Sequence, residues 1–97
     1  SSRQKIQPVV VNVPIKIFVA PNPVNNTATV MFDAINAYTY TITITDIWGK
    51  MLVRKECIAF KGKNITTIDL HIYPDGMYIL TFVNNKDEIS RLKLIKE

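Results

Sequence analysis

Residues 38–45 read Tyr-Thr-Tyr-Thr-Ile-Thr-Ile-Thr, and this alternation of apolar and polar side chains decides the fold. Successive side chains of a β-strand point to opposite faces, so the tyrosines and isoleucines share one face and the four threonines share the other. The segment is therefore predicted to be a strand with one face in the core and one face in water.

Similar runs recur on both sides of this segment, separated by turn-forming residues. Residues 28–34 repeat the alternation, whereas residues 77–83 are apolar on both faces, as expected for a central strand that is covered on both sides. The predicted strands are residues 6–13, 15–20, 28–34, 38–45, 65–70, 77–83 and 89–95. Turns are predicted at residues 21–23, 46–50, 61–64, 74–76 and 84–87.

About seven strands at this spacing, with no apolar stripe of helical period, predict an all-β domain. The expected architecture is an immunoglobulin-like antiparallel β-sandwich. Pro8 and Pro14 indicate an edge strand or a linker at the start, because proline cannot donate a ladder hydrogen bond. We therefore assign residues 1–14 to a linker or edge segment and residues 15–97 to one sandwich domain.

The composition is that of a folded domain. The chain has 97 residues, of which 47% are hydrophobic and 21% are charged, which is too apolar for a disordered chain. Its apolar runs are a few residues long, whereas a membrane-spanning helix needs about 20. The chain begins Ser-Ser-Arg, with neither an initiator methionine nor a signal peptide, and we interpret it as a piece of a longer protein.

The net charge of +4 is concentrated in residues 50–63, where five cations face one anion and the difference equals the whole excess. The cations are Lys50, Arg54, Lys55, Lys61 and Lys63. Such a cluster could attract an anionic partner such as phosphate or lipopolysaccharide. We favour a solvated edge strand, because lysines on an edge block pairing between molecules. Nucleic acid is not an expected partner, because the cluster lacks interleaved aromatics and a recognition helix.

No set of residues supports catalysis, a metal site or a cofactor, so the chain is not expected to be an enzyme. Cys57 is the only cysteine, and a half-buried strand position is a better interpretation than an intermolecular crosslink. His71 is the only histidine, and a structural or surface role is expected because no nucleophile motif accompanies it. Five aspartates, Asp33, Asp46, Asp69, Asp75 and Asp87, are spread singly over turns and strand ends without calcium-loop spacing.

Two segments are interpreted as turn devices. In residues 46–50 the Asp46 side chain can accept hydrogen bonds from amides of the turn, and Gly49 can supply a positive φ. Residues 74–76 turn the chain into the next strand, where Tyr78 is expected to point its ring inward while its hydroxyl ties down a neighbouring loop.

The order of the motifs along residues 17–96 resembles the type A C-terminal sorting domain of proteins exported by the type IX secretion system of Bacteroidetes. The matching segments are residues 19–24, 46–50, 62–64, 68–70, 76–80 and 91–96. The structural motif residues are Pro21, Asn22, Pro23, Asp46, Gly49 and Lys50. The sequence departs from the family pattern in the bulky Trp48 of the turn and in Glu97 after the terminal lysine.

The resemblance implies that the domain is a secretion signal at the end of a larger protein. Family members reach the periplasm, are recognised by an outer-membrane shuttle and translocon, and are exported to the cell surface or the medium. A sortase-like peptidase typically removes the domain and attaches the cargo to anionic lipopolysaccharide. The chain is then a substrate of this machinery and not a catalyst.

The resemblance also places translocon recognition on the final strand and its surroundings, at Gly76, Tyr78, Arg91, Lys93, Leu94 and Lys96. Alternation in the strand puts Arg91, Lys93 and Ile95 on one face, where two cations beside an apolar side chain could steer and anchor a partner. Spacing alone would favour an ordinary solvated face.

Two other functions remain open at this point. An accessory sandwich module could bind carbohydrate or protein at the cell surface, but Tyr38, Tyr40 and Tyr78 fall on predicted core faces, which leaves Trp48 nearly alone as a sugar platform. A structural domain could instead self-associate through its edge strands.

Overall fold

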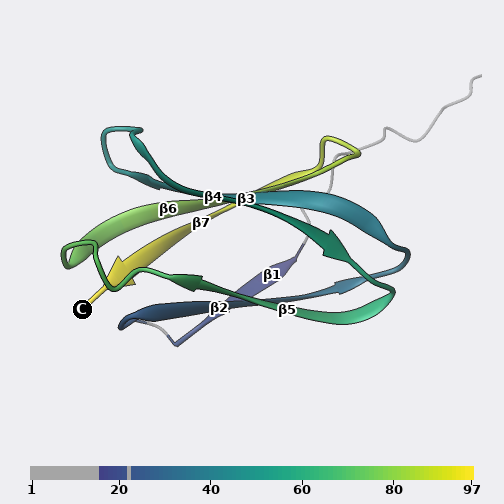
Figure 1. Ribbon diagram of the computed structural model, residues 1–97, viewed down its shortest axis with the longest axis horizontal. Coiled ribbons are helices and arrows are strands. Elements are labelled where there is room, and N and C mark those ends of the chain that lie inside the picture. The colour runs from purple at the N-terminus through teal and green to yellow at the C-terminus, as the bar shows by residue number, and fades with distance from the viewer. Residues whose placement is uncertain (1–15, 22) are drawn as a thin grey trace, which may run out of the picture.

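The computed structural model describes residues 16–21 and 23–97, and in them the chain forms strands and no helix (Figure 1). The strands are β1 (Ile17–Ala20), β2 (Thr27–Ala34), β3 (Tyr38–Asp46), β4 (Met51–Ala59), β5 (Gly62–Asp69), β6 (Gly76–Asn84) and β7 (Ile89–Lys96). The predicted strand at residues 6–13, and the whole segment 1–14 assigned to a linker or edge, lie outside the described residues.

Two antiparallel sheets face each other as separate layers in Figure 1. One has the strand order β1-β2-β5 and the other has the order β4-β3-β6-β7. The prediction of an immunoglobulin-like antiparallel β-sandwich is confirmed.

A backbone contact joins the connection between β1 and β2 to the four-stranded sheet. After β1 the chain leaves the three-stranded sheet, and Val24 pairs in parallel with the end of β7. The Val24 amide donates to the carbonyl oxygen of Ile95 at 2.8 Å, and the Glu97 amide donates to the carbonyl oxygen of Val24 at 2.9 Å. The final strand is thus held by β6 on one side and, at its end, by a residue from the start of the domain.

The core lies between the sheets and confirms the inward faces predicted for residues 28–34 and 38–45. Phe32, Tyr40 and Phe82 pack together, with the Tyr40 and Phe82 rings stacked at a centroid distance of 4.8 Å and Phe32 edge-on to Phe82 at 5.0 Å. Burial of each such side chain stabilises the fold by about 1.5–3 kcal/mol. The other fully buried large residues are Val24, Val30, Ile42, Ile44, Leu70 and Leu80.

The described residues form seven strands, in agreement with the predicted number, and one of them was not predicted. The unpredicted strand is β4, whose side chains mix apolar and charged types on both faces. This pattern arises because β4 is an edge strand, so the opposite sheet covers its inner face only partly. Of the five cations in the basic segment, Arg54 and Lys55 lie on this edge strand and Lys63 lies on β5, the edge strand of the other sheet. Lys50 and Lys61 lie in the connections next to β4.

The cations of this segment do not form one surface. Lys55 points inward, where its Nζ donates to the Thr66 hydroxyl at 3.0 Å and to the Thr67 carbonyl oxygen at 2.9 Å, so it ties the edges of the two sheets together. Arg54 lies on the outer face and pairs with Glu56 at 2.6 Å. An inward-pointing charge on an edge strand also discourages pairing with other chains.

The predicted turn at residues 46–50 has the expected geometry. The Asp46 carboxylate accepts hydrogen bonds from the amides of Trp48 and Lys50, both at 2.9 Å, and Gly49 has a φ of 86°. This tight connection joins β3 to β4.

Two details of the predicted elements are wrong. The turn at residues 61–64 is shorter than expected, because β5 already begins at Gly62. The buried Asn64 side chain closes the corner by accepting from the Phe60 amide at 3.0 Å and donating to the Phe60 carbonyl oxygen at 2.8 Å. β6 is a central strand as predicted, but its outward side chains are half-buried, because the opposite sheet covers only its inner face.

Candidate recognition surface on the final strand

β7 presents two chemically different faces. Ser90, Leu92, Leu94 and Lys96 point inward, and Ile89, Arg91, Lys93 and Ile95 point outward. Arg91 and Lys93 are exposed and Ile95 is half-buried. The prediction that Arg91, Lys93 and Ile95 share one face is confirmed.

The side chains of β6 that lie opposite the outer face of β7 are uncharged. Arg91 lies opposite Thr81, Lys93 lies opposite Ile79, and Ile95 lies opposite Met77. Side chains directly opposite each other in an antiparallel pair share a face and are close enough to touch. The outer surface of β6 and β7 therefore combines two positive charges with a partly exposed apolar strip.

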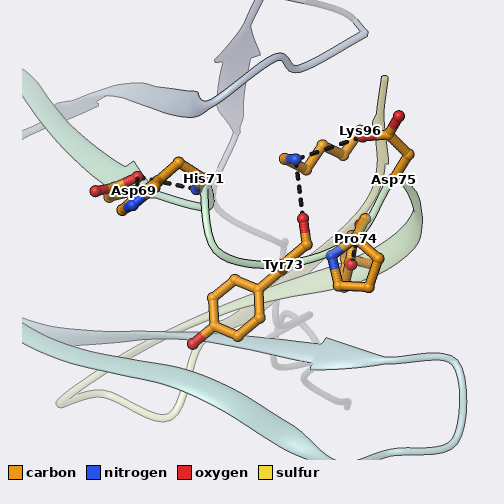
Figure 2. A network of polar contacts seen from close by, with 7 residues as sticks. Asp69, His71, Tyr73, Pro74, Asp75 and Lys96 are labelled. Carbon is orange, nitrogen blue, oxygen red and sulfur yellow. Dashed lines mark hydrogen bonds and ion pairs between the residues drawn. The ribbon is translucent and has the colours of Figure 1, made fainter.

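Lys96 lies on the other face and is buried. Its side chain is 7% exposed, and its Nζ donates to the carbonyl oxygen of Tyr73 at 2.9 Å and lies 3.4 Å from an Asp75 carboxylate oxygen (Figure 2). The ammonium group thus fastens the end of β7 to the loop before β6. Sequence reasoning could not anticipate this, because lysine is almost never fully buried unless it is paired.

Tyr78 and Leu94 are also buried, and they lie opposite each other on β6 and β7. As predicted, the Tyr78 ring points inward and its hydroxyl ties down a loop by donating to the carbonyl oxygen of Pro74. Burial raises the pKa of Tyr78, and the nearby charges of Asp75 and Asp46 add to the effect. The Pro74 ring and the loop around it appear next to Lys96 in Figure 2.

The six residues predicted for recognition are therefore divided between surface and core. Gly76, Arg91 and Lys93 are exposed, whereas Tyr78, Leu94 and Lys96 are buried. The buried three connect β6, β7 and the loop between β5 and β6. They position the strand, and the exposed residues are the ones that a partner can reach.

The Pro-rich structural motif lies beside the end of this strand. Pro21 follows a cis peptide bond after β1, and both Pro21 and Pro23 are exposed. Asn22 lies outside the described residues. The motif is followed directly by Val24, which is 2% exposed and pairs with the end of β7. Sequence reasoning missed Val24, because a parallel contact between residues so distant in the chain leaves no local pattern.

Cys57 and His71 were the other residues considered for a chemical role. Cys57 is half-buried on β4 opposite Tyr40, as predicted. His71 is exposed, and its Nδ1 lies 2.8 Å from an Asp69 carboxylate oxygen that also accepts the His71 amide at 3.0 Å (Figure 2). These two interactions lower the pKa of Asp69, the amide contributing more than the ring.

Within residues 16–21 and 23–97, no three histidine, cysteine or acidic side chains gather where they could hold a metal ion. The same residues contain no helix that is long and apolar enough to cross a membrane.

Among the described residues, three aromatic side chains are largely exposed and no ring contact joins them: Phe18 on β1, Trp48 in the β3–β4 turn and Phe60 in the β4–β5 turn. Tyr40 and Tyr78 are buried and Tyr38 is half-buried and packed against the core, as predicted. Trp48 is 86% exposed at the tip of the β3–β4 hairpin. Phe18 is exposed on the other sheet, where it lies opposite Met31 on the outer face.

Comparison with known proteins identifies a family for this chain. Residues 18–97 match the family model of the secretion system C-terminal sorting domain. No curated protein matches the chain in sequence. Among solved structures, the crystal structure of a β-glucosidase from Listeria innocua in complex with glucose is similar over 84% of this chain, with 9% sequence identity and a TM-score of 0.47.

The chain spans only 16% of that β-glucosidase, and a likeness at this level carries no argument about function. The family match, in contrast, covers the whole sandwich from β1 to β7. Sorting signals of this kind are not enzymes; they interact with the type IX secretion machinery and lead to export to the cell surface or the medium. This chain belongs to the family of secretion system C-terminal sorting domains, the signals of type IX secretion.

Proposed function

We propose that this domain, a sorting domain of type A, directs a larger cargo protein across the outer membrane by presenting the outer surface of β7 to the outer-membrane shuttle of the type IX system. The cargo first reaches the periplasm. A sortase-like peptidase then removes the domain and joins the cargo to anionic lipopolysaccharide. The domain is the substrate at every step.

The observation that carries this proposal is the pairing of Arg91 and Lys93 with a partly exposed apolar strip on one open face. Exposed charges increase the rate of encounter with an oppositely charged partner, and apolar side chains that become buried supply affinity. The described residues give neither cation an acidic partner within ion-pair distance. Both cations are therefore available to a partner.

The buried members of the predicted set support recognition indirectly. Tyr78 packs opposite Leu94, and Lys96 bonds to the loop at Tyr73, so the exposed face of β7 exists only when the sandwich is folded. We infer that the shuttle recognises the folded domain and not the unfolded C-terminal peptide.

We propose that cleavage takes place before the sandwich. A peptidase needs an accessible, extended backbone, and the strands of a folded sandwich do not offer one. Removal at this position leaves the sorting domain intact and releases the cargo from it.

A charge-reversal experiment tests the recognition surface. The double variant Arg91→Glu/Lys93→Glu is placed behind a periplasmic fluorescent protein in a type IX-competent bacterium, and export of fluorescence is measured. The control is Lys50→Glu/Arg54→Glu, which makes the same change in net charge in the β3–β4 turn and on β4, the opposite edge strand of the same sheet. It also removes the exposed ion pair of Arg54 with Glu56. The proposal predicts loss of export for the β7 variant only. Equal export of the two variants, with both domains folded, would contradict it.

A further inference from the structure

In the described part of the chain, the edge of β7 that faces away from β6 has no backbone partner except at its end. In an antiparallel pair, the amide and carbonyl groups of alternate residues point toward the neighbouring strand and away from it. Val24 bonds to the carbonyl oxygen of Ile95 and the amide of Glu97, so the odd-numbered residues of β7 point away from β6. Arg91 and Lys93 therefore direct their amide and carbonyl groups toward the edge.

Val24 covers only the end of this edge. Among residues 16–21 and 23–97, no backbone hydrogen bond is made to the edge-facing groups of Arg91 and Lys93. A row of unpaired amide and carbonyl groups is a template for another strand.

A groove runs beside the open edge, between the last strand of one sheet and the first strand of the other. It has a volume of about 220 Å³ and contains apolar side chains from both β1 and β7. The residues that line it are Ile17, Phe18, Val19, Pro21, Val24, Leu92, Lys93 and Leu94. A strand that paired with β7 would direct alternate side chains toward this groove.

We infer that the edge of β7 at residues 91–93 is a β-strand addition site, and that it takes an extended segment of a partner protein in which apolar and acidic residues alternate. In strand addition, main-chain hydrogen bonds supply affinity and alternate side chains supply specificity. The apolar side chains enter the groove, and the acidic side chains lie beside Arg91 and Lys93 on the outer face. The inference rests on the proposed function, since the partner is a component of the export machinery.

The contact of Val24 shows that a backbone running parallel to β7 pairs with the end of this edge, at Lys96. The added segment would occupy the same edge immediately before this contact.

The charges of the edge argue against a second copy of the domain as the occupant. Pairing two β7 strands about a two-fold axis near residues 91–93 would place Arg91 and Lys93 of one copy next to the same cations of the other. Like charges in directly opposite positions destabilise a strand pair. The acidic heterologous segment has the complementary charge.

The first test measures hydrogen exchange of the isolated 97-residue domain. The amides of Arg91 and Lys93 are expected to exchange rapidly, whereas those of Leu92 and Leu94, which face β6, are expected to be protected. Equal protection of all four amides would mean that the edge is already covered, and would overturn the inference.

The second test compares Lys93→Pro with Lys93→Ala in export of the fluorescent fusion. Both remove the charge, but only proline removes the edge-facing amide, and an edge strand tolerates proline at such a position. Loss of backbone bonds to a partner is expected to lower export by Lys93→Pro about tenfold relative to Lys93→Ala. Thermal melting checks that both variants fold, and Arg91→Pro against Arg91→Ala repeats the comparison if Lys93→Pro does not fold.

Equal export of the folded proline and alanine variants would overturn strand addition while leaving the proposed function in place. Failure of the unaltered domain to direct export would overturn the proposed function, and this inference with it.

Discussion

At the scale of single residues, Asp46 and Asn84 close the two hairpins of the four-stranded sheet in the same way. The side-chain oxygen of Asn84 accepts from the amides of Lys86 at 2.9 Å and Glu88 at 3.0 Å, as that of Asp46 does from residues 48 and 50. The fourth residue of each turn has a positive φ, 86° at Gly49 and 61° at Asp87. One turn thus has glycine where the other has a residue with a side chain.

This difference predicts that removing the glycine from one turn and adding a glycine to the other change the free energy of unfolding in opposite directions. Left-handed backbone costs a residue with a Cβ roughly 1–2 kcal/mol. Gly49→Ala is therefore expected to destabilise the domain by about 1 kcal/mol, whereas Asp87→Gly is expected to stabilise it by about 0.5 kcal/mol after the entropy of glycine is included. Urea unfolding of the two variants measures both changes. Destabilisation by both would show that the Asp87 side chain contributes more than its backbone strain costs.

The Asp69–His71 contact predicts a pH effect in the acid range. The depressed pKa in the folded state means that ionised Asp69 favours folding; this contribution is present above the unfolded pKa and is lost as the pH falls through the folded pKa. An NMR titration should give a pKa below the ordinary value of 3.8. In His71→Ala the pKa should return only partway, because the amide of residue 71 remains. A complete return would contradict the larger contribution of the amide.

At the scale of the elements, the strands with one wet face were predictable and the irregular ones were not. Residues 28–34 and 38–45 alternate cleanly, because each has a fully covered inner face. β4 escaped prediction because Lys55 points inward and crosses to the other sheet. The alternation of β7 correctly separated its faces, but it could not show that Lys96 would be buried, since the groups that bond to it come from a distant loop.

The buried position of Lys96 predicts that the length of its side chain contributes more to stability than its charge. Lys96→Met keeps an unbranched side chain in the buried site and should change the free energy of unfolding by less than about 1 kcal/mol, because replacing a buried charge by an apolar group is often neutral. Lys96→Ala leaves a cavity and should cost about 2 kcal/mol. If Lys96 only positions β7, the Met variant is exported normally. A stable but unexported Met variant would show that the ammonium group itself is recognised.

At the scale of the whole molecule, composition and periodicity were sufficient to predict a sandwich, because a small all-β chain with these strands must bury one face of each sheet against the other. They could not predict the contact of Val24 with β7, which brings the two ends of the domain together. The sequence motifs led to the family and to β7. The structure then shows which of the six residues predicted for recognition are exposed and which are buried.

The contact of Val24 with β7 affects how a deletion of the C-terminal residues is interpreted. Removing residues 92–97 takes away the buried Leu94 and Lys96 together with both hydrogen-bond partners of Val24. Such a deletion is expected to unfold the domain, so that the melting transition disappears. A retained transition would show that the first six strands are stable without the end of the seventh. Point variants on the outer face are the cleaner test of recognition.

The most direct measurement of the central claim is export of a periplasmic fluorescent protein fused in front of residues 1–97. The fusion is expressed in a type IX-competent bacterium and in a matched strain that lacks the type IX translocon, and fluorescence is measured in the periplasm, at the cell surface and in the medium. The account predicts surface or secreted fluorescence in the competent strain and periplasmic fluorescence in the deficient one. Periplasmic retention in both strains, while the native cargo of the competent strain is exported normally, would contradict it.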